Sequence, residues 1–267
     1  MLIKEKPSLL MESFLKDYNS LYDIDIDKAK HYIKTNIHFD HLTDKWYDDL
    51  LKYELDVAYQ VYNDDYYFTD MWNCFATYSR RYLRDISKAC MPNGQSFVEL
   101  TSDSKIVVDI GCGIGYSTSS LTELYPNATV YGTNLKNTKQ WTFCNLMSKR
   151  YGFNMIEDVS EIDSTVDIIF ASEYFEHFLD PIEHFNEICR KVSPKYFVIA
   201  NAFNTKSIGH FITYKVNNID IDQKFISRMF NKNIRSKGYS RVETKLFNNK
   251  PNIWKKQDTQ SINDYFK

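Results

Sequence analysis

Three glycines follow an apolar, β-branched run, and this stretch has the strongest chemical signature in the chain. Residues 106–115 read Ile-Val-Val-Asp-Ile-Gly-Cys-Gly-Ile-Gly, and a polar segment with helical spacing follows at 116–124. The pattern predicts a strand, a tight turn and a helix, in which the glycines let the backbone approach a ligand. A plain glycine-rich turn is the alternative. Three of the eight glycines fall within five residues, which favours ligand binding.

Two acids and a histidine follow a second apolar run, at residues 166–172, and are the candidate catalytic residues. They are Glu173, Glu176 and His177. Ligands of open α/β sheets bind at the carboxyl ends of the strands, so we expect this loop to face the ligand crevice. The ordinary pKa of histidine suits proton transfer near neutral pH. A structural role, with the histidine bonded to backbone groups, is the alternative.

Polar and aromatic residues later in the chain are candidates for binding a second reactant. Asn201 follows a buried run at 196–200, and His210 and Tyr214 come soon after it. With Tyr174, these side chains are expected to line an acceptor pocket. An aromatic packing surface is the alternative explanation.

Strands and helices alternate regularly from residue 105 to residue 200. This alternation predicts βαβ units and a mostly parallel sheet. Beyond residue 202 we expect a strand or loop ending at the Asn217-Asn218 turn, a helix closed by Gly238, and an antiparallel terminal hairpin. The expected strands are 105–110, 129–132, 153–157, 166–172, 196–200, 241–247 and 252–256, the expected strand or loop is 209–216, and the expected helices are 116–124, 137–151, 181–192 and 222–237.

Residues 1–95 have helical and aromatic spacing without the strands that follow. We expect them to form a helical cap or lid, with helices around 9–15, over 46–59 with Asp44 as N-cap, and over 71–83. Pro92-Asn93-Gly94 is the clearest break. The expected division is therefore a cap of residues 1–95 and a ligand-binding domain of residues 96–267.

Tyr78, Arg80 and Arg81 lie in the third predicted helix of the cap. An arginine close to the glycine turn can bind a ligand carboxylate through two parallel hydrogen bonds. A solvated helix face explains the same residues equally well.

The composition excludes several classes of protein. The chain has 267 residues, of which 43% are apolar, enough for a substantial core. No apolar run reaches the roughly 18–20 residues that cross a membrane, and the N-terminus is unlike a secretory signal. Five dispersed cysteines without a C-x-x-C pair indicate neither a metal site nor a disulfide framework. A cytoplasmic protein fits these features best.

Charge is distributed unevenly along the chain. Residues 1–199 contain 20 basic and 30 acidic residues, whereas residues 200–267 contain 13 basic and 5 acidic residues. The basic end can attract a polyanion or simply complement the acidic body. Four of its residues share one face of the helix predicted at 222–237, where they form either a phosphate-binding stripe, aided by Lys250, Lys255 and Lys256, or a solvated surface. They are Lys224, Arg228, Lys232 and Arg235.

The glycine turn and the later segments together resemble the class I S-adenosylmethionine-dependent methyltransferases over roughly residues 105–257. The resemblance rests on Val-Asp-Ile-Gly-Cys-Gly-Ile-Gly at 108–115, on residues 166–177, on Asp180-Pro181 and on Gly238-Tyr239. It implies a Rossmann-like, seven-stranded, mostly parallel sheet with an antiparallel terminal hairpin, to which the N-terminal helical cap is added. It also implies S-adenosylmethionine as the cofactor of the domain at 96–267.

The resemblance assigns cofactor-binding roles to particular positions. The glycine turn would surround the methionine moiety, Asn134 and Leu135 would meet the ribose, and Asp158 and Val159 would meet the adenine. Asn134 departs from the family, which usually has an acid there, although an amide still donates and accepts hydrogen bonds. The implied cofactor-binding residues are Asp109, Gly111, Cys112, Gly113, Gly115, Asn134, Leu135, Asp158, Val159 and Glu173.

The function implied by the resemblance is direct methyl transfer to a small-molecule or nucleotide-type acceptor. A second hypothesis is a nucleic-acid-modifying or nucleic-acid-binding protein that uses the basic C-terminal region. A third is a domain that keeps the fold without methyl transfer, for which Asn134 is the indication. The Ser-Glu-Tyr-Phe sequence at 172–175 lacks the motifs of adenine-amine and cytosine-C5 methylation, and the glycine spacing does not favour a dehydrogenase.

Overall fold

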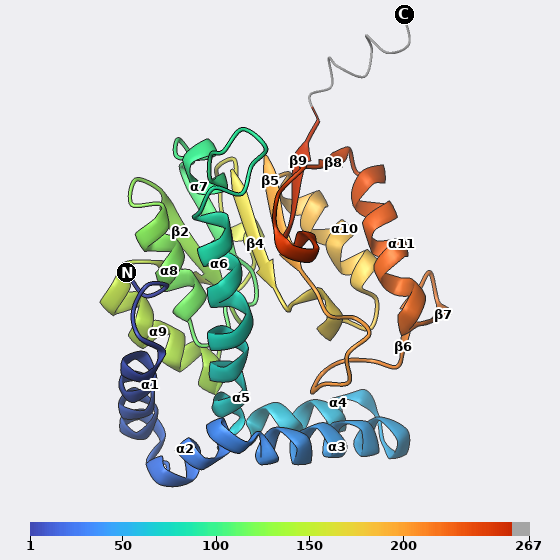
Figure 1. Cartoon of the computed structure of the whole chain (residues 1–267). Helices are drawn as coiled ribbons and strands as arrows, with labels where there is room; N and C mark the ends of the chain where they lie inside the picture. Colours follow the sequence, from blue (N-terminus) through green and yellow to red (C-terminus); the bar gives the residue numbers. More distant parts are fainter. Residues whose placement is uncertain (258–267) are drawn as a thin grey trace, which may run out of the picture.

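A seven-stranded sheet forms the centre of the computed structural model, which describes residues 1–257 (Figure 1). The strand order is β3-β2-β1-β4-β5-β9-β8; the first five are parallel, and β9 runs antiparallel to both neighbours. The predicted Rossmann-like fold class is thus confirmed. The strands are β1 (Ile106–Asp109), β2 (Thr129–Thr133), β3 (Asn154–Ile156), β4 (Ile168–Ser172), β5 (Tyr196–Ala200), β8 (Tyr239–Arg241) and β9 (Asn252–Lys256).

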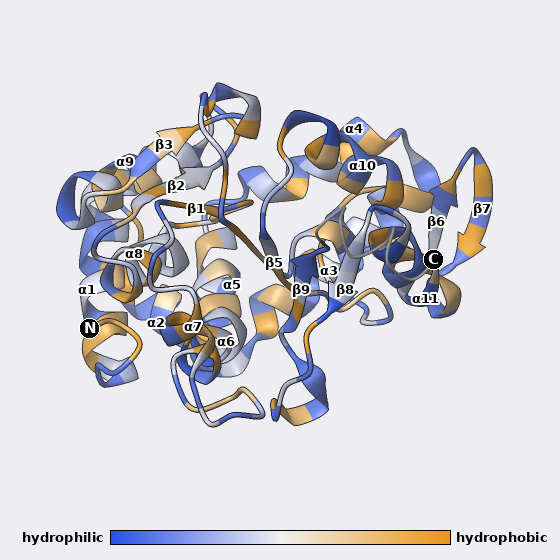
Figure 2. Cartoon of the chain, turned by 90° about the horizontal axis from the view of Figure 1, so that it is seen from above, coloured by the Kyte–Doolittle hydropathy of each residue, from blue (hydrophilic) through white to orange (hydrophobic). Residues whose placement is uncertain are grey.

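Helices cover both faces of this sheet, which explains why β5, and β4 up to its last residue Ser172, are apolar rather than alternating. Figures 1 and 2 place α6 (Arg80–Ile86) and α8 (Tyr116–Leu124) on one side, and α10 (Pro181–Lys191) and α11 (Gln223–Ser236) on the other. A further helix, α9 (Lys139–Tyr151), packs beside α8. The α10 helix starts where the sequence predicts, because Asp180 accepts a hydrogen bond from the Glu183 N–H and Pro181 occupies the first turn.

The N-terminal region is helical, as predicted. Its last long helix is continuous: α5 (Tyr67–Cys74) passes through a π-helical turn (Phe75–Ser79) into α6. The remaining helices are α1 (Pro7–Tyr22), α2 (Ile26–Thr35), α3 (Ile37–Lys52), α4 (Leu55–Ala58), a 3₁₀ turn (Tyr59–Asn63) and α7 (Phe97–Leu100).

The prediction of an N-cap at Asp44 is wrong. The α3 helix begins at Ile37, because Asn36 takes a left-handed conformation with φ 56° that ends α2 and starts α3. Asp44 lies inside α3, where its carboxylate contacts Lys206 Nζ at 2.9 Å. In Figure 1, α3 and α4 lie across one end of the sheet domain.

One continuous hydrophobic core joins the cap helices to the sheet domain. The Phe14 ring of α1 stacks on Trp72 and also contacts Tyr116 and Phe143 of the sheet domain. Buried aromatic pairs of this kind add about 0.5–1.5 kcal/mol each beyond the area they bury. No helix within residues 1–257 combines the length and apolar character needed to cross a membrane.

The C-terminal part differs from the prediction in two places. The residues at 213–216 form β6 (Thr213–Val216), but β7 (Ile219–Asp222) was not predicted; it pairs with β6 across Asn217 and Asn218, which both have positive φ. The strand predicted at 241–247 is wrong: β8 spans Tyr239–Arg241, and the Lys245 N–H donates to Cys90 O outside the sheet. The last ten residues of the predicted domain 96–267 lie outside the described residues.

Candidate functional site

The glycine turn lies between β1 and α8, at the carboxyl end of β1. Gly111, Gly113 and Gly115 have φ values of 67°, 57° and 80°, a region that favours glycine over residues with side chains. The Gly111 N–H donates to Thr133 Oγ1 at 3.0 Å and the Cys112 N–H to Thr133 O at 3.0 Å. The end of β2 therefore holds the turn in place.

Asp109, the last residue of β1, holds the residues that follow this turn through hydrogen bonds. Its Oδ2 accepts hydrogen bonds from Ser117 Oγ at 2.6 Å and Thr118 Oγ1 at 2.7 Å, and the residue is 1% exposed. Burial raises the pKa of Asp109 to about 6, although the two hydrogen bonds act in the opposite direction. The carboxylate thus bonds the end of β1 to the first turn of α8, and it is buried there.

Asn134, at the end of β2, is bonded to protein through both ends of its amide. Its Nδ2 donates to Gly113 O at 2.9 Å, and its Oδ1 accepts from the Leu135 N–H at 3.0 Å. Cys144 Sγ also donates to Gly113 O, at 2.8 Å, and lies 3.6 Å from Cys112 Sγ. The structure therefore places Asn134 and Cys112 at the glycine turn, while Leu135 is mostly exposed.

Asp158 follows β3 and caps a 3₁₀ turn (Val159–Glu161) in which Val159 is buried. Its Oδ1 accepts from the Ser160 N–H at 2.8 Å, and its Oδ2 lies 2.7 Å from Lys191 Nζ. Burial acts to raise the pKa of Asp158, but the bonds from Lys191 and Ser160 outweigh it and lower the pKa to about 2. The carboxylate therefore stays ionised and available as an acceptor.

Tyr174 covers part of the glycine turn. A Cβ atom on residue 111 would lie 2.2 Å from Tyr174 Cδ2, and the Tyr174 hydroxyl is 2.9 Å from His184 Nε2. Glu173, just before it, has a positive φ of 50°, an unusual conformation that commonly occurs at functional sites. Its N–H donates to Ala200 O at 2.7 Å, and its Oε1 accepts from Tyr82 OH at 3.1 Å.

Glu176 is fully buried and joins the loops that follow β4 and β5. Its Oε1 accepts from the Ala202 N–H at 2.7 Å, and in the amide orientation that satisfies both neighbours Asn201 donates to its Oε2 at 3.0 Å. Burial, followed by the nearby charge of Glu173, raises the pKa of Glu176 well above its ordinary value. Tyr214 is buried as well and donates to Glu176 O at 3.1 Å.

The half-buried His177 and the buried His210 form a pair with ring centroids 4.9 Å apart. His177 Nδ1 lies 3.3 Å from Tyr62 OH, and His210 Nδ1 lies 2.8 Å from Thr205 O. Burial lowers the pKa of His177 to about 3, with help from His210, and lowers the pKa of His210 to about 4. Both rings are therefore neutral at physiological pH and are weak bases.

The cap contributes residues to this region that sequence reasoning missed. Met71 lies over the glycine turn, since a Cβ atom on Gly113 would be 3.1 Å from Met71 Cε. Asp70 and Cys74, one turn apart on α5, are enclosed by protein yet keep some solvent-accessible surface. Burial raises the pKa of Asp70 to about 7. The sequence shows only that Asp70 and Cys74 are spaced by one helical turn. This spacing does not reveal which face of α5 lies toward the glycine turn.

The predicted arginine ligand is not at the glycine turn. Arg80 donates to Leu2 O and Glu5 O instead, and Arg81 lies over the rings of Tyr78 and Tyr82. Across residues 1–257, no cluster of three or more His, Cys, Asp or Glu side chains has a metal-binding arrangement.

Several solved structures resemble parts of the chain. One chain of a fibrillarin/Nop5p complex matches with 13% identity over 52% of this chain and 64% of its own, at a TM-score of 0.38. Magnesium protoporphyrin IX methyltransferase from Synechocystis PCC 6803, with bound S-adenosylhomocysteine, matches with 13% identity over 67% of this chain and 85% of its own, at a TM-score of 0.43.

The 1,6-didemethyltoxoflavin-N1-methyltransferase from Burkholderia thailandensis matches with 14% identity over 67% of this chain and 78% of its own, at a TM-score of 0.41. The protein spans less than two thirds of the matched chain of the fibrillarin/Nop5p complex, and TM-scores below 0.5 assign neither substrate nor activity to it. No curated protein matches the sequence.

The sequence itself identifies the family. The family described as "Methyltransferase domain" matches residues 79–237, from the end of the π-helical turn to the end of α11. This match contains the glycine turn and the loop after β4, and it covers more than half of the chain. The protein therefore belongs to the methyltransferase domain family.

Proposed function

We propose that the protein is an enzyme that transfers a methyl group from S-adenosylmethionine to a small-molecule acceptor. The observation that carries this proposal is the glycine turn: three glycines with positive φ at the carboxyl end of β1, in a chain of the methyltransferase domain family. Such a turn lets backbone groups approach a ligand where side chains would obstruct it.

The residues around the turn fit the cofactor. In the proposal, Gly111 and Gly113 face the methionine moiety, and Glu173 accepts from its amino group. Asn134 and Leu135 then contact the ribose, and the ionised Asp158, with Val159, contacts the adenine. Asp109, Cys112 and Gly115 are buried, so we assign them the role of holding the turn.

The Tyr174 ring is part of this proposal, because it lies against Gly111. Binding then requires the ring to leave the turn, and the Tyr174–His184 hydrogen bond opposes that movement. A ligand that binds only the open arrangement shifts the population toward it. We propose Tyr174 as a residue between the cofactor and acceptor positions.

The acceptor is proposed to bind between the cap and the loops after β4 and β5. When bound, S-adenosylmethionine supplies an activated methyl group, so the protein mainly has to orient the acceptor and exclude water. Asn201, Met71 and Cys74 keep accessible surface for this purpose, whereas His210 and Tyr214 are buried and support the pocket from behind. This assigns residues 1–95 the role of a cap.

Asp70 is the best candidate for a general base. Its pKa of about 7 lies near the operating pH, where proton transfer is most efficient. The pKa of His177, about 3, makes it a weak base, and burial favours the protonated form of Glu176 by raising its pKa. Glu173 is more suited to binding than to proton transfer, because it already accepts from Tyr82.

A nucleic-acid substrate is the second candidate, favoured by one observation. The buried face of α11 consists of Ile226, Phe230 and Ile234, which leaves the basic stripe exposed. Its four members make no salt bridge shorter than 4.0 Å with the acids of residues 1–257. Binding of this kind weakens steeply with salt.

Calorimetric titration separates these possibilities. The proposal expects S-adenosylmethionine and S-adenosylhomocysteine each to bind once per chain. Binding of neither would overturn both the site and the activity, and would favour a domain that keeps the fold without methyl transfer. Salt-sensitive binding of RNA or DNA that is lost on Arg228→Glu/Lys232→Glu would favour the nucleic-acid candidate.

A further inference from the structure

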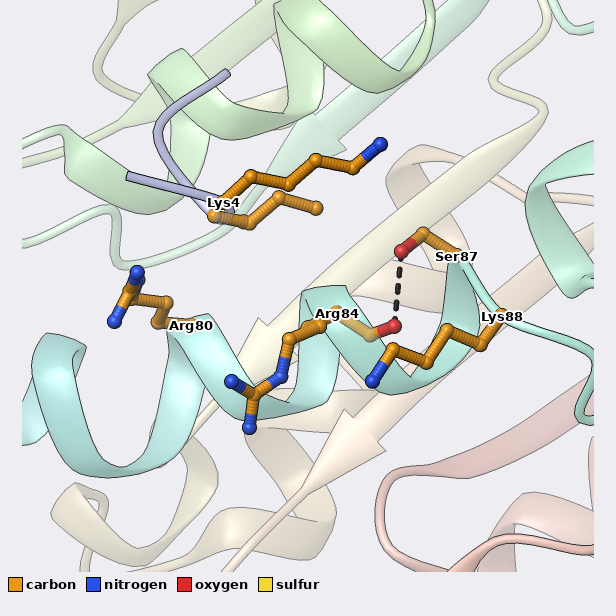
Figure 3. Close-up of a pocket in the computed structure, with 6 residues that line it drawn as sticks. Lys4, Arg80, Arg84, Ser87 and Lys88 are labelled. Atoms are coloured by element: carbon orange, nitrogen blue, oxygen red, sulfur yellow. Dashed lines mark hydrogen bonds between the residues drawn. The ribbon is translucent and has the colours of Figure 1, made fainter. Parts of the chain in front are cut away.

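A basic cavity lies between the N-terminal segment and α6, apart from the glycine turn. Its volume is about 430 Å³. Figure 3 shows Lys4 reaching over α6 while Arg84 and Lys88 project from the helix. The cavity is lined by Ile3, Lys4, Arg80, Arg84, Ser87 and Lys88.

The fold brings these charges together from two segments. Arg80, Arg84 and Lys88 recur every four residues, so they share one side of the helix and its C-terminal extension. Lys4 comes from a segment nearly eighty residues away in sequence. Arg80 fixes that segment by donating to Leu2 O and Glu5 O, and the Leu2 N–H donates to Glu123 Oε2 at 2.6 Å.

The four basic side chains lack acidic partners. Within residues 1–257, none of them lies within 4.0 Å of a carboxylate oxygen. Burial lowers the pKa of Arg80, and the charge of Arg84 lowers it further, while Glu5 acts weakly in the opposite direction. The cationic groups therefore repel one another, and a bound anion would relieve that repulsion.

A helix end explains only part of this arrangement. Cations near a helix C-terminus are stabilised by the partial negative charge of the last carbonyls, which accounts for Arg84 and Lys88. Ser87 donates to Arg84 O at 2.8 Å as a local cap of the same end. The effect does not explain why Lys4, from another segment, faces the same cavity.

We infer that this cavity is a second binding site, which takes the phosphate groups of a small molecule such as a nucleoside diphosphate. Guanidinium groups match phosphate oxygens through paired hydrogen bonds, and lysines add point charges. The volume lies within the range of small-molecule pockets, and Ile3 supplies an apolar wall. A concave pocket suits a compact phosphate group better than an extended polynucleotide backbone.

This site is separate from the proposed cofactor site. Met71, which lies over the glycine turn, precedes Arg84 by thirteen residues of one continuous helix. At 1.5 Å per residue the two positions are about 20 Å apart. The inference therefore does not depend on methyl transfer.

The test is calorimetric titration of the full chain with inorganic pyrophosphate and, separately, with ADP at low salt. We expect one saturable site per chain for pyrophosphate, and at least tenfold weaker binding in Arg84→Glu/Lys88→Glu. Arg84→Gln/Lys88→Gln repeats the test with a smaller perturbation, and circular dichroism checks that both variants fold. The matched control is Arg228→Glu/Lys232→Glu, which makes the same charge change on α11 and should bind within twofold of the parent.

Three outcomes would count against the inference, and a fourth would support it. No saturable binding of either probe would overturn it, and so would equal loss in the α11 control, which would indicate non-specific charge attraction. Displacement of pyrophosphate by S-adenosylhomocysteine would place the probe at the glycine turn instead. Tighter binding of ADP than of pyrophosphate, with the same loss in the α6 variants, would support the nucleotide as the source of the phosphate.

Discussion

The Tyr174 ring lies against Gly111 so closely that any side chain at residue 111 would collide with it. The built Cβ position is 2.2 Å from Tyr174 Cδ2, and Gly111 also has a φ of 67°. Glycine is thus required here twice, for its backbone conformation and for its lack of a side chain. The same contact places an aromatic ring over the turn that we assign to the cofactor.

The first prediction separates these two requirements. Gly152, at the end of α9, also has positive φ (77°), but its built Cβ has no neighbour within 4 Å. Gly152→Ala is expected to cost about 1–2 kcal/mol from the left-handed conformation alone. Gly111→Ala should cost at least about 1 kcal/mol more, because the ring must shift, and should abolish cofactor binding. Urea unfolding measures the loss of stability and calorimetry measures cofactor binding. Equal destabilisation by Gly111→Ala and Gly152→Ala would show that the Tyr174 ring moves away without a free-energy penalty.

The second prediction concerns Asn134→Asp. A carboxylate accepts more strongly from ribose hydroxyls than an amide does, so we expect S-adenosylhomocysteine to bind roughly tenfold more tightly, or about 1.4 kcal/mol. The bond to Gly113 O is lost, so the unliganded protein should be less stable. Asn134→Ala is the control, since it removes the same bond without adding an acceptor. Weaker binding by Asn134→Asp than by the parent would show that residue 134 does not contact the ribose.

The third prediction is a pH dependence set by Asp70. Its folded pKa of about 7 lies above the ordinary value of 3.8, so the folded state favours the protonated form. Its contribution to stability is therefore full below about pH 4 and is lost as the pH rises toward 7, by up to about 4 kcal/mol. Asp70→Asn should remove this loss, and the stability difference from the parent should grow between pH 4 and pH 8. Asp163→Asn, on the surface, controls for the charge change.

The proposed role of Asp70 as general base leads to a prediction for catalysis. If it is the general base, the rate of methyl transfer should rise with pH through about 7, and Asp70→Asn should flatten that rise and lower kcat by roughly 10²–10⁴-fold. Unchanged binding of S-adenosylhomocysteine would show that the variant keeps its site. A pH profile identical to that of the parent would assign the proton transfer elsewhere or show that none is needed.

The fourth prediction tests the protonation of Glu176. Because burial raises the pKa of its carboxyl group and so favours the neutral form, Glu176→Gln should stay within about 1 kcal/mol of the parent in stability. Glu176→Ala leaves the Ala202 N–H and the Asn201 amide without their partner and should cost about 2 kcal/mol or more. Thermal unfolding of both variants measures this. Equal destabilisation by the two substitutions would show that the group is ionised.

Local patterns in the sequence determined much of the sheet domain. The strand at 196–200 and the helix at 116–124 have the predicted bounds. The strand is visible in the sequence as an unbroken apolar run, and the start of the helix is marked by the glycines before it. The predicted strand boundary was wrong where a distant contact decided it: residues 243–246 leave the sheet, and the Lys245 N–H donates to Cys90 O. The resemblance to methyltransferases that the glycine turn indicated agrees with the match of residues 79–237 to the methyltransferase domain family.

Tertiary structure alone decided what the site residues contact. The sequence placed Asp109 and Asn134 beside the turn, but only packing directs Asp109 to α8 and Asn134 to Gly113. The pKa of Asp70 is raised by its burial in the folded protein, which the sequence pattern around it does not reveal. The basic cavity likewise exists only because folding carries Lys4 onto the surface of α6.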